Sequence, residues 1–111
     1  MNHDCIDIVE IGSFSRTFDK LVGSSERKKL YQYFADKPNA GDVIPGSGGL
    51  RKLRWARPGM GKQGGVRIIY YFYNSKAQLF LLEVFAKSAY TDLDKNGLKI
   101  LQRMVEKLKQ E

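Results

Sequence analysis

The chain has 111 residues, of which 42% are hydrophobic and 28% charged, with 19 Lys and Arg against 12 Asp and Glu. These values indicate a single folded domain over residues 1–111 and exclude a disordered chain. The single Cys5 excludes an intramolecular disulfide, and no apolar run approaches the roughly 20 residues that span a bilayer. Because the N-terminus also lacks the pattern of a signal peptide, we expect a soluble cytoplasmic protein.

The first third of the chain predicts a strand followed by two helices. Residues 6–11 are rich in β-branched side chains, which favours a strand. A helix capped by Ser13 and ended by Gly23 follows, and a second helix starts at Ser24 or Ser25. Each helix has apolar residues on one face, so we expect the two to form a hairpin over a core.

The rest of the chain predicts three strands and a last helix. The expected elements are a loop over 38–49, strands over 50–55, 66–73 and 78–86, with a tight turn at 74–76, and a helix from about Asp94, capped by Asp94 or Thr91. Helices that are separate from an antiparallel meander predict an α+β domain. In this arrangement the helices cover one face of the sheet and leave the other face free.

Positive charge is concentrated in the middle of the chain. No acidic residue occurs from Val43 to Leu82, whereas seven Lys and Arg residues fall there: Arg51, Lys52, Arg54, Arg57, Lys62, Arg67 and Lys76. Strand alternation places Lys52 and Arg54 on the same side. Together with Arg67 and Lys87 they predict a basic face that contacts the phosphates of a nucleic acid. A solvated face that serves solubility is the alternative.

The glycine and aromatic residues in this region indicate a function less specifically than the cations do. The segment 59–65 lacks the spacing of a phosphate-binding loop, so we interpret it as a flexible basic loop with Lys62 at its tip. Alternation in the strand over 66–73 favours core positions for Tyr70 and Phe72, and Trp55 is expected to pack in the core or on the sheet. Tyr90, beside Lys87, is better placed to act on a ligand.

Few residues are available for the usual hydrolytic chemistry. His3 is the only histidine and Cys5 the only cysteine, and the acidic residues fall mostly in the expected helices. The sequence therefore predicts no metal site, no cofactor and no nucleophile–histidine pair. If the protein cleaves nucleic acid, it does so without a metal ion and without histidine.

Three segments resemble a known family when they are taken together. Residues 41–54, 61–71 and 85–93 resemble, in order, the signature of the RelE/HigB superfamily of bacterial type II toxins. The run GDVIPGSGGLRK at 41–52 is most similar to the HigB-type branch. The resemblance implies a microbial-RNase-type α+β fold, in which an antiparallel sheet carries an N-terminal helical hairpin and a C-terminal helix.

The resemblance also implies an activity and its residues. Family members cut mRNA in the ribosomal A site, where a substrate 2′-hydroxyl attacks the adjacent phosphate, and a cognate antitoxin, here expected to be of the helix-turn-helix type, neutralises them. By position, Lys52, Arg54, Arg67 and Lys87 correspond to the family's catalytic basic residues, and Tyr90 stands near its catalytic tyrosine. Lys52 or Lys87 is a candidate general base. Contact with RNA is assigned to Arg51, Arg57 and Lys62.

Two other functions stay open from the residues alone. Ser88 and Asp94 stand where some relatives carry a basic residue and the catalytic tyrosine, which keeps open a catalytically inactive module that binds RNA or an antitoxin. A domain whose basic face binds an acidic protein is the third possibility.

Overall fold

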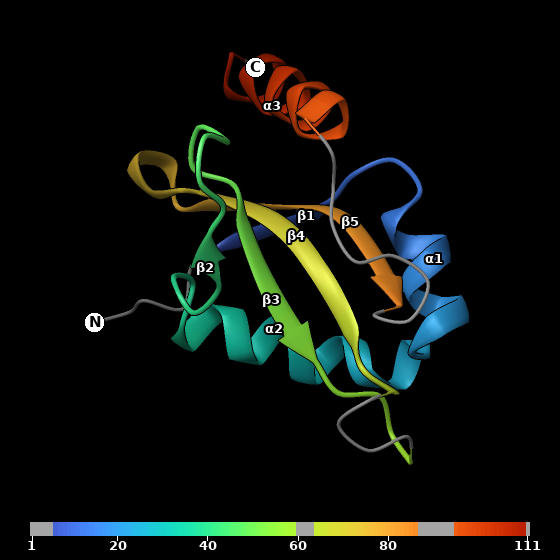
Figure 1. Cartoon of the computed structure of the whole chain (residues 1–111). Helices are drawn as coiled ribbons and strands as arrows, with labels where there is room; N and C mark the ends of the chain where they lie inside the picture. Colours follow the sequence, from blue (N-terminus) through green and yellow to red (C-terminus); the bar gives the residue numbers. More distant parts are fainter. Residues whose placement is uncertain (1–5, 60–63, 87–94, 111) are drawn as a thin grey trace.

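The computed structural model describes residues 6–59, 64–86 and 95–110. Figure 1 shows a sheet between helices. Its elements are β1 (Asp7–Glu10), α1 (Phe14–Leu21), the 3-10 turn η1 (Ser24–Glu26), α2 (Arg27–Asp36), β2 (Asp42–Val43), β3 (Arg51–Trp55), β4 (Val66–Tyr73), the 3-10 turn η3 (Asn74–Lys76), β5 (Gln78–Ala86) and α3 (Lys95–Lys109). The α+β class is as predicted, and β4 and β5 have the predicted bounds.

The sheet has the strand order β1-β5-β4-β3-β2. Strands β2 to β5 pair in antiparallel fashion, whereas β1 pairs with β5 in parallel. The prediction of a wholly antiparallel sheet is therefore wrong at this edge. A parallel neighbour needs a long connection, which the helices and the other strands supply here.

The segment predicted as a loop over 38–49 contains a short strand. Asp42 and Val43 of β2 pair with Lys52 and Arg51 of β3. The prediction of a loop over the whole of 38–49 is wrong at these two positions, because the glycines and prolines of the segment flank them rather than occupy them.

Helices cover both faces of the sheet. Phe14, Phe18, Leu30 and Phe34 of α1 and α2 are buried against one face. On the other face, Leu101 and Val105 of α3 pack with a set of buried sheet residues: Leu50, Ile69, Phe80 and Leu82. Figure 1 shows α3 on the opposite side of the sheet from α2. The prediction that one face of the sheet is free is therefore wrong where α3 covers it. The apolar side chains on that face of the sheet are stabilised by removal from water, and α3 provides the cover.

The ends of the helices agree only in part with the predicted caps. Ser13 stands at the N-cap of α1, but its side chain makes no capping hydrogen bond, so that prediction is wrong. Gly23 follows α1 with a φ of +111°, a conformation that favours glycine. The predicted caps of α3, Thr91 and Asp94, lie outside the described residues.

A hydrogen-bonded cluster joins β1 to α1 and α2. Arg27 Nε donates to Glu10 Oε2 at 2.7 Å, and Arg27 Nη1 donates to Asp19 Oδ1 at 2.7 Å. The Tyr31 hydroxyl donates to Glu10 Oε2 at 2.5 Å. Burial by itself raises the pKa of Glu10, but the hydrogen bonds from Arg27 and Tyr31 outweigh it and hold the pKa below its ordinary value. The cluster therefore favours an ionised Glu10.

Tyr70 fastens the chain that enters β2. Its ring is fully buried, its hydroxyl donates to the Pro38 carbonyl at 2.9 Å, and it accepts from the Gly41 amide at 2.8 Å. A Cβ at Gly41 would lie 2.8 Å from Tyr70 Cε1, so only glycine fits this close approach. These contacts fix β2 beside the basic residues of β3.

Candidate functional site

Three cations lie together on β3 and β4. Arg54 is directly opposite Arg67 in the antiparallel register, and Lys52 is opposite Ile69. Residues opposite each other share a face of the sheet, and so do residues two apart along a strand. Lys52, Arg54 and Arg67 therefore share the face that carries α3, as the alternation of β3 predicts. We call these three residues the basic site.

No side chain in the described ranges neutralises the basic site. None of the ion pairs or side-chain hydrogen bonds among residues 6–59, 64–86 and 95–110 involves the side chain of Lys52, Arg54 or Arg67. Like charges placed directly opposite on a sheet are destabilising. Arg54 and Arg67 line a pocket of about 210 Å³ where β3 ends and β4 begins. A bound phosphate there would relieve the repulsion and accept hydrogen bonds from both guanidinium groups.

The other cations predicted to contact RNA are placed differently. Arg51 points away from the basic site, and its Nη1 donates to the Gly41 carbonyl at 2.6 Å and to the Asn39 carbonyl at 3.1 Å. Arg57 donates from Nε to the Gly64 carbonyl, so it joins the two ends of the 57–64 loop. Both guanidinium groups therefore hold backbone. Lys62, Lys87 and Tyr90 lie outside the described residues.

The aromatic residues have the predicted core positions. Tyr70 is fully buried, Phe72 packs against the same cluster, and the Trp55 ring lies 5.6 Å from that of Tyr33 in an edge-to-face arrangement. Base stacking by the fully buried Tyr70 ring is therefore excluded, whereas Phe72 and Trp55 are partly buried against the core.

Glu83 is a residue of this face that the sequence analysis missed. It stands opposite Ile69 on β5, so Lys52 and Glu83 flank Ile69 in one row across three strands. The Glu83 carboxyl is half-buried and has no hydrogen-bond partner among the described residues, and burial raises its pKa. The available signal was its position, since Glu83 is the acidic residue that ends the acid-free stretch.

Replacing Glu83 by Gln is expected to stabilise the protein at neutral pH. The raised pKa means that the folded state binds the proton more tightly, so stability falls as pH rises through the folded pKa. Gln is neutral and similar in shape, and we expect a melting temperature higher by about 1–4 °C at pH 7.5. The difference should shrink as the pH falls toward the ordinary pKa of 4.5 and vanish at about pH 3, where the carboxyl is protonated in both states. Melting curves over this pH range test it.

The matched control for that experiment is Glu106→Gln on α3. Glu106 is exposed and pairs with Lys109 at 3.7 Å, and such pairs contribute little. Its melting temperature should stay within about 1 °C of the wild type at every pH. Equal stability of Glu83→Gln and wild type at pH 7.5 would show that the half-buried carboxyl carries no penalty.

Within the described ranges, no group of three or more His, Cys, Asp and Glu side chains is placed to hold a metal ion. Over the same part of the chain, no helix combines the length and apolar character that crossing a membrane requires.

The five-stranded sheet with its helices forms an α+β fold that is similar to a known toxin fold. No profile of a known protein family matches the sequence. Among solved structures, the chain is similar to a mutant of the E. coli toxin RelE in the free state. The TM-score is 0.55 at 18% sequence identity, and the match covers 76% of this chain and 85% of that one. The shared feature at this level of identity is the fold.

Proposed function

We propose that this protein is a toxin of a type II toxin–antitoxin system that cleaves mRNA on the ribosome, and that it belongs to the HigB-type branch. The observation that carries the proposal is the unneutralised basic site on a RelE-like sheet, with Arg54 directly opposite Arg67. The run at 41–52 supports the branch. The expected partners are the ribosome, its mRNA and a small antitoxin of the helix-turn-helix type, in the cytoplasm.

The proposed reaction needs only the substrate and side chains. The 2′-oxygen attacks the adjacent phosphorus and loses its proton to a general base, while the bond from phosphorus to the 5′-oxygen breaks and that oxygen gains a proton. The products are a 2′,3′-cyclic phosphate and a 5′-hydroxyl. Arg54 and Arg67 would bind the phosphate and stabilise the charge that builds on its oxygens. Lys52, beside Arg54 on β3, is the described candidate for proton transfer.

Induced expression tests the proposal directly. Expression of the wild-type chain should arrest growth, and primer extension on ribosome-bound mRNA should reveal new 5′ ends. Purified ribosomes programmed with a defined mRNA should give the same ends, and these should carry a 5′-hydroxyl. Intact mRNA in the presence of folded protein would reject the nuclease and favour a module that binds RNA or an antitoxin.

A further inference from the structure

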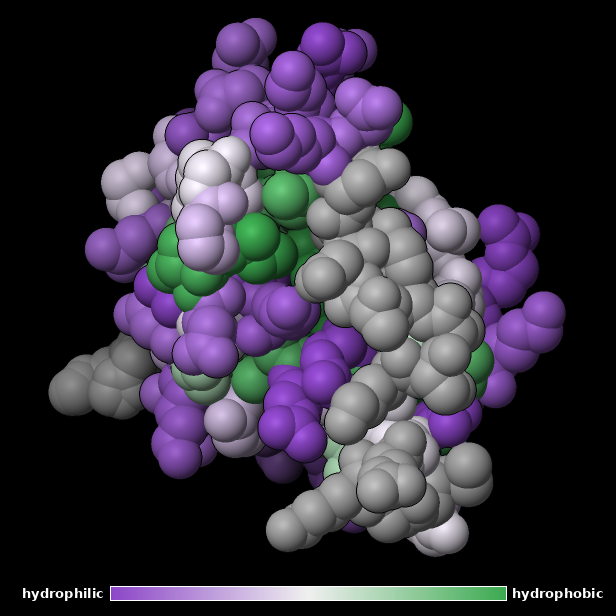
Figure 2. Space-filling model, viewed as in Figure 1, coloured by the Kyte–Doolittle hydropathy of each residue, from purple (hydrophilic) through white to green (hydrophobic). Residues whose placement is uncertain are grey.

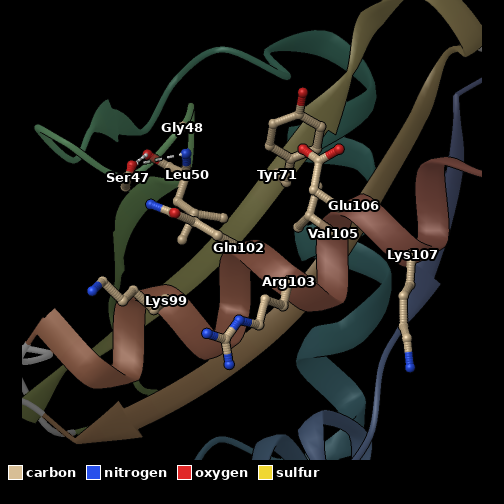
Figure 3. Close-up of a pocket in the computed structure, with 10 residues that line it drawn as sticks. All are labelled: Ser47, Gly48, Leu50, Tyr71, Lys99, Gln102, Arg103, Val105, Glu106 and Lys107. Atoms are coloured by element: carbon tan, nitrogen blue, oxygen red, sulfur yellow. Dashed lines mark hydrogen bonds between the residues drawn. The ribbon is translucent and has the colours of Figure 1, made fainter.

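The exposed side of α3 carries a regular row of cations. Lys95, Lys99, Arg103 and Lys107 follow one another at intervals of four residues and are all exposed. Side chains four apart are neighbours on a helix surface, and four residues rise by about 6 Å. The row is therefore about 18 Å long. Figure 3 shows Lys99, Arg103 and Lys107 in succession along the helix, and Figure 2 shows hydrophilic side chains over α3.

The row has no partner within the described part of the chain. Among the described residues, Lys109 of α3 forms an ion pair with Glu106, whereas no side chain of the four cations in the row takes part in an ion pair or hydrogen bond. By contrast, Arg27 and Lys29 on α2 are paired with acidic residues. Like charges at this spacing repel by roughly 0.2–0.5 kcal/mol per pair. Because no acidic side chain in the described residues offsets the repulsion among these four cations, the row indicates an anionic partner.

A pocket adjoins the row. It has a volume of about 560 Å³ and lies between α3 and the turn before β3, and Lys99, Arg103 and Lys107 contribute to its wall. The turn is held by Ser47 Oγ, which accepts from the Leu50 amide at 3.0 Å, and Gln102 Nε2 donates to the Gly46 carbonyl at 3.1 Å. The helix that carries the row is therefore held in two ways, by the packing of its apolar face on the sheet and by the hydrogen bond from Gln102 to the turn before β3.

The position of α3 connects the row to the basic site. Leu101 and Val105 pack α3 against the sheet face that holds Lys52, Arg54 and Arg67. One side of the molecule thus presents both sets of unpaired cations, whereas α1 and α2 lie on the other side. A membrane surface fits poorly, because the apolar face of α3 is buried in the core and a helix that lies on lipid needs that face.

We propose that the row on α3 is a docking surface for the phosphate backbone of double-helical RNA, distinct from the basic site. An even row of cations suits evenly spaced phosphates, and double-stranded RNA is recognised mainly through its shape and backbone. If the protein acts on the ribosome as proposed above, this RNA is the ribosomal RNA around the cleavage site. The identification of the RNA as ribosomal rests on that proposed function. The row positions the toxin, and the basic site acts on the mRNA.

The test compares two triple variants in an Arg67→Ala background, so that bound RNA stays intact. The row variant carries Lys99→Gln, Arg103→Gln and Lys107→Gln. The control carries Arg16→Gln, Lys20→Gln and Lys28→Gln, which removes the same charges from exposed positions of α1 and α2. The probe is an RNA duplex of about 16 base pairs, the span that one double-stranded RNA-binding domain covers. Affinity is measured between 50 and 200 mM salt, the range over which phosphate contacts show their salt dependence.

The row variant should bind at least tenfold more weakly at low salt, and its logarithmic salt slope should be shallower by about three, near one per lost phosphate contact. The control should keep the slope of its parent. Equal slopes in the two variants would overturn the proposal. So would a row variant that binds the duplex normally but loses binding to anionic phospholipid vesicles or to an acidic protein.

The test of the docking surface and the test of the proposed nuclease function can fail independently of each other. Loss of duplex binding in the row variant, with no mRNA cleavage by the chain that retains Arg67, would support the docking surface and reject the nuclease. Normal ribosome binding by the row variant, with cleavage by the chain that retains Arg67, would reject the docking surface alone.

Discussion

Replacement of Arg67 by Ala is expected to abolish mRNA cleavage and growth arrest without loss of the fold. Arg67 is directly opposite Arg54 and has no acidic partner among the described residues. Its removal takes away one of two guanidinium groups that would stabilise the transition-state charge, and a loss of about 10²–10³ in rate is typical for such a group. Single-turnover cleavage of mRNA on programmed ribosomes measures the effect.

Stability supplies an independent signature of the same variant. Because the Arg54–Arg67 pair is repulsive, its removal should leave the free energy of unfolding unchanged or raise it by about 0.2–1 kcal/mol. A catalytic loss that came from unfolding would show the opposite sign. Denaturant unfolding of the purified variant distinguishes the two.

Two further substitutions serve as comparisons for the cleavage rate of Arg67→Ala. Lys76→Ala removes a charge from the exposed η3 turn of the same hairpin and should leave cleavage at the wild-type rate. Arg67→Lys retains the charge but not the planar fork, so it should cleave at a rate between those of Ala and wild type. A folded Arg67→Ala protein that arrests growth as the wild type does would remove Arg67 from the site.

Local pattern predicts the central strands well because their signal is local. β4 is rich in β-branched and aromatic residues, β5 is mostly apolar, and a turn separates them, so both bounds are as predicted. The pairing of β1 with β5 is different, because the 67 residues 11–77 separate Glu10 from Gln78 and nothing in either strand specifies a parallel neighbour. The same reasoning applies to α3, whose apolar face does not indicate which side of the sheet it covers.

The candidate site was predictable to the extent that it depends on alternation. The period of two placed Lys52 with Arg54, but the direct opposition of Arg54 and Arg67 depends on the β3–β4 register. Arg51 differs because its role depends on carbonyl groups of the 39–41 segment, which lie far from it in an extended chain. Glu83 was missed because a lone acid in an apolar strand has no pattern until its neighbours on β4 are known.

Replacement of Arg27 by Met is expected to give a large loss of stability. Met keeps an apolar contact with the Phe18 ring, over which the Arg27 guanidinium lies at 5.1 Å, but it removes both ion pairs. Glu10, with 12% of its side chain exposed, would lose the hydrogen bonds from Arg27 and keep the one from Tyr31. Breaking a buried pair costs about 3–5 kcal/mol, and because Arg27 is partly exposed we expect about 2–3 kcal/mol. Urea unfolding at pH 7 measures it.

The pH dependence identifies the cause of that loss. The folded-state pKa of Glu10 is lowered, so its contribution to stability is present above its unfolded pKa of 4.5 and is lost as pH falls through the folded value. The gap between wild type and Arg27→Met should therefore be widest at neutral pH and should narrow below about pH 4. A gap that stays constant with pH would assign the loss to packing rather than to the Glu10 carboxylate.

Lys29→Met is the matched control on the same helix. Lys29 is exposed and lies 3.5 Å from Glu26, and an exposed pair of this kind contributes about 0–1 kcal/mol. Its unfolding midpoint should stay close to that of the wild type at each pH. Because the Arg27 cluster lies on the opposite side of the sheet from the basic site, folded Arg27→Met protein should still cleave mRNA below its unfolding temperature. Stability and catalysis would then be shown to depend on different layers of the same sheet.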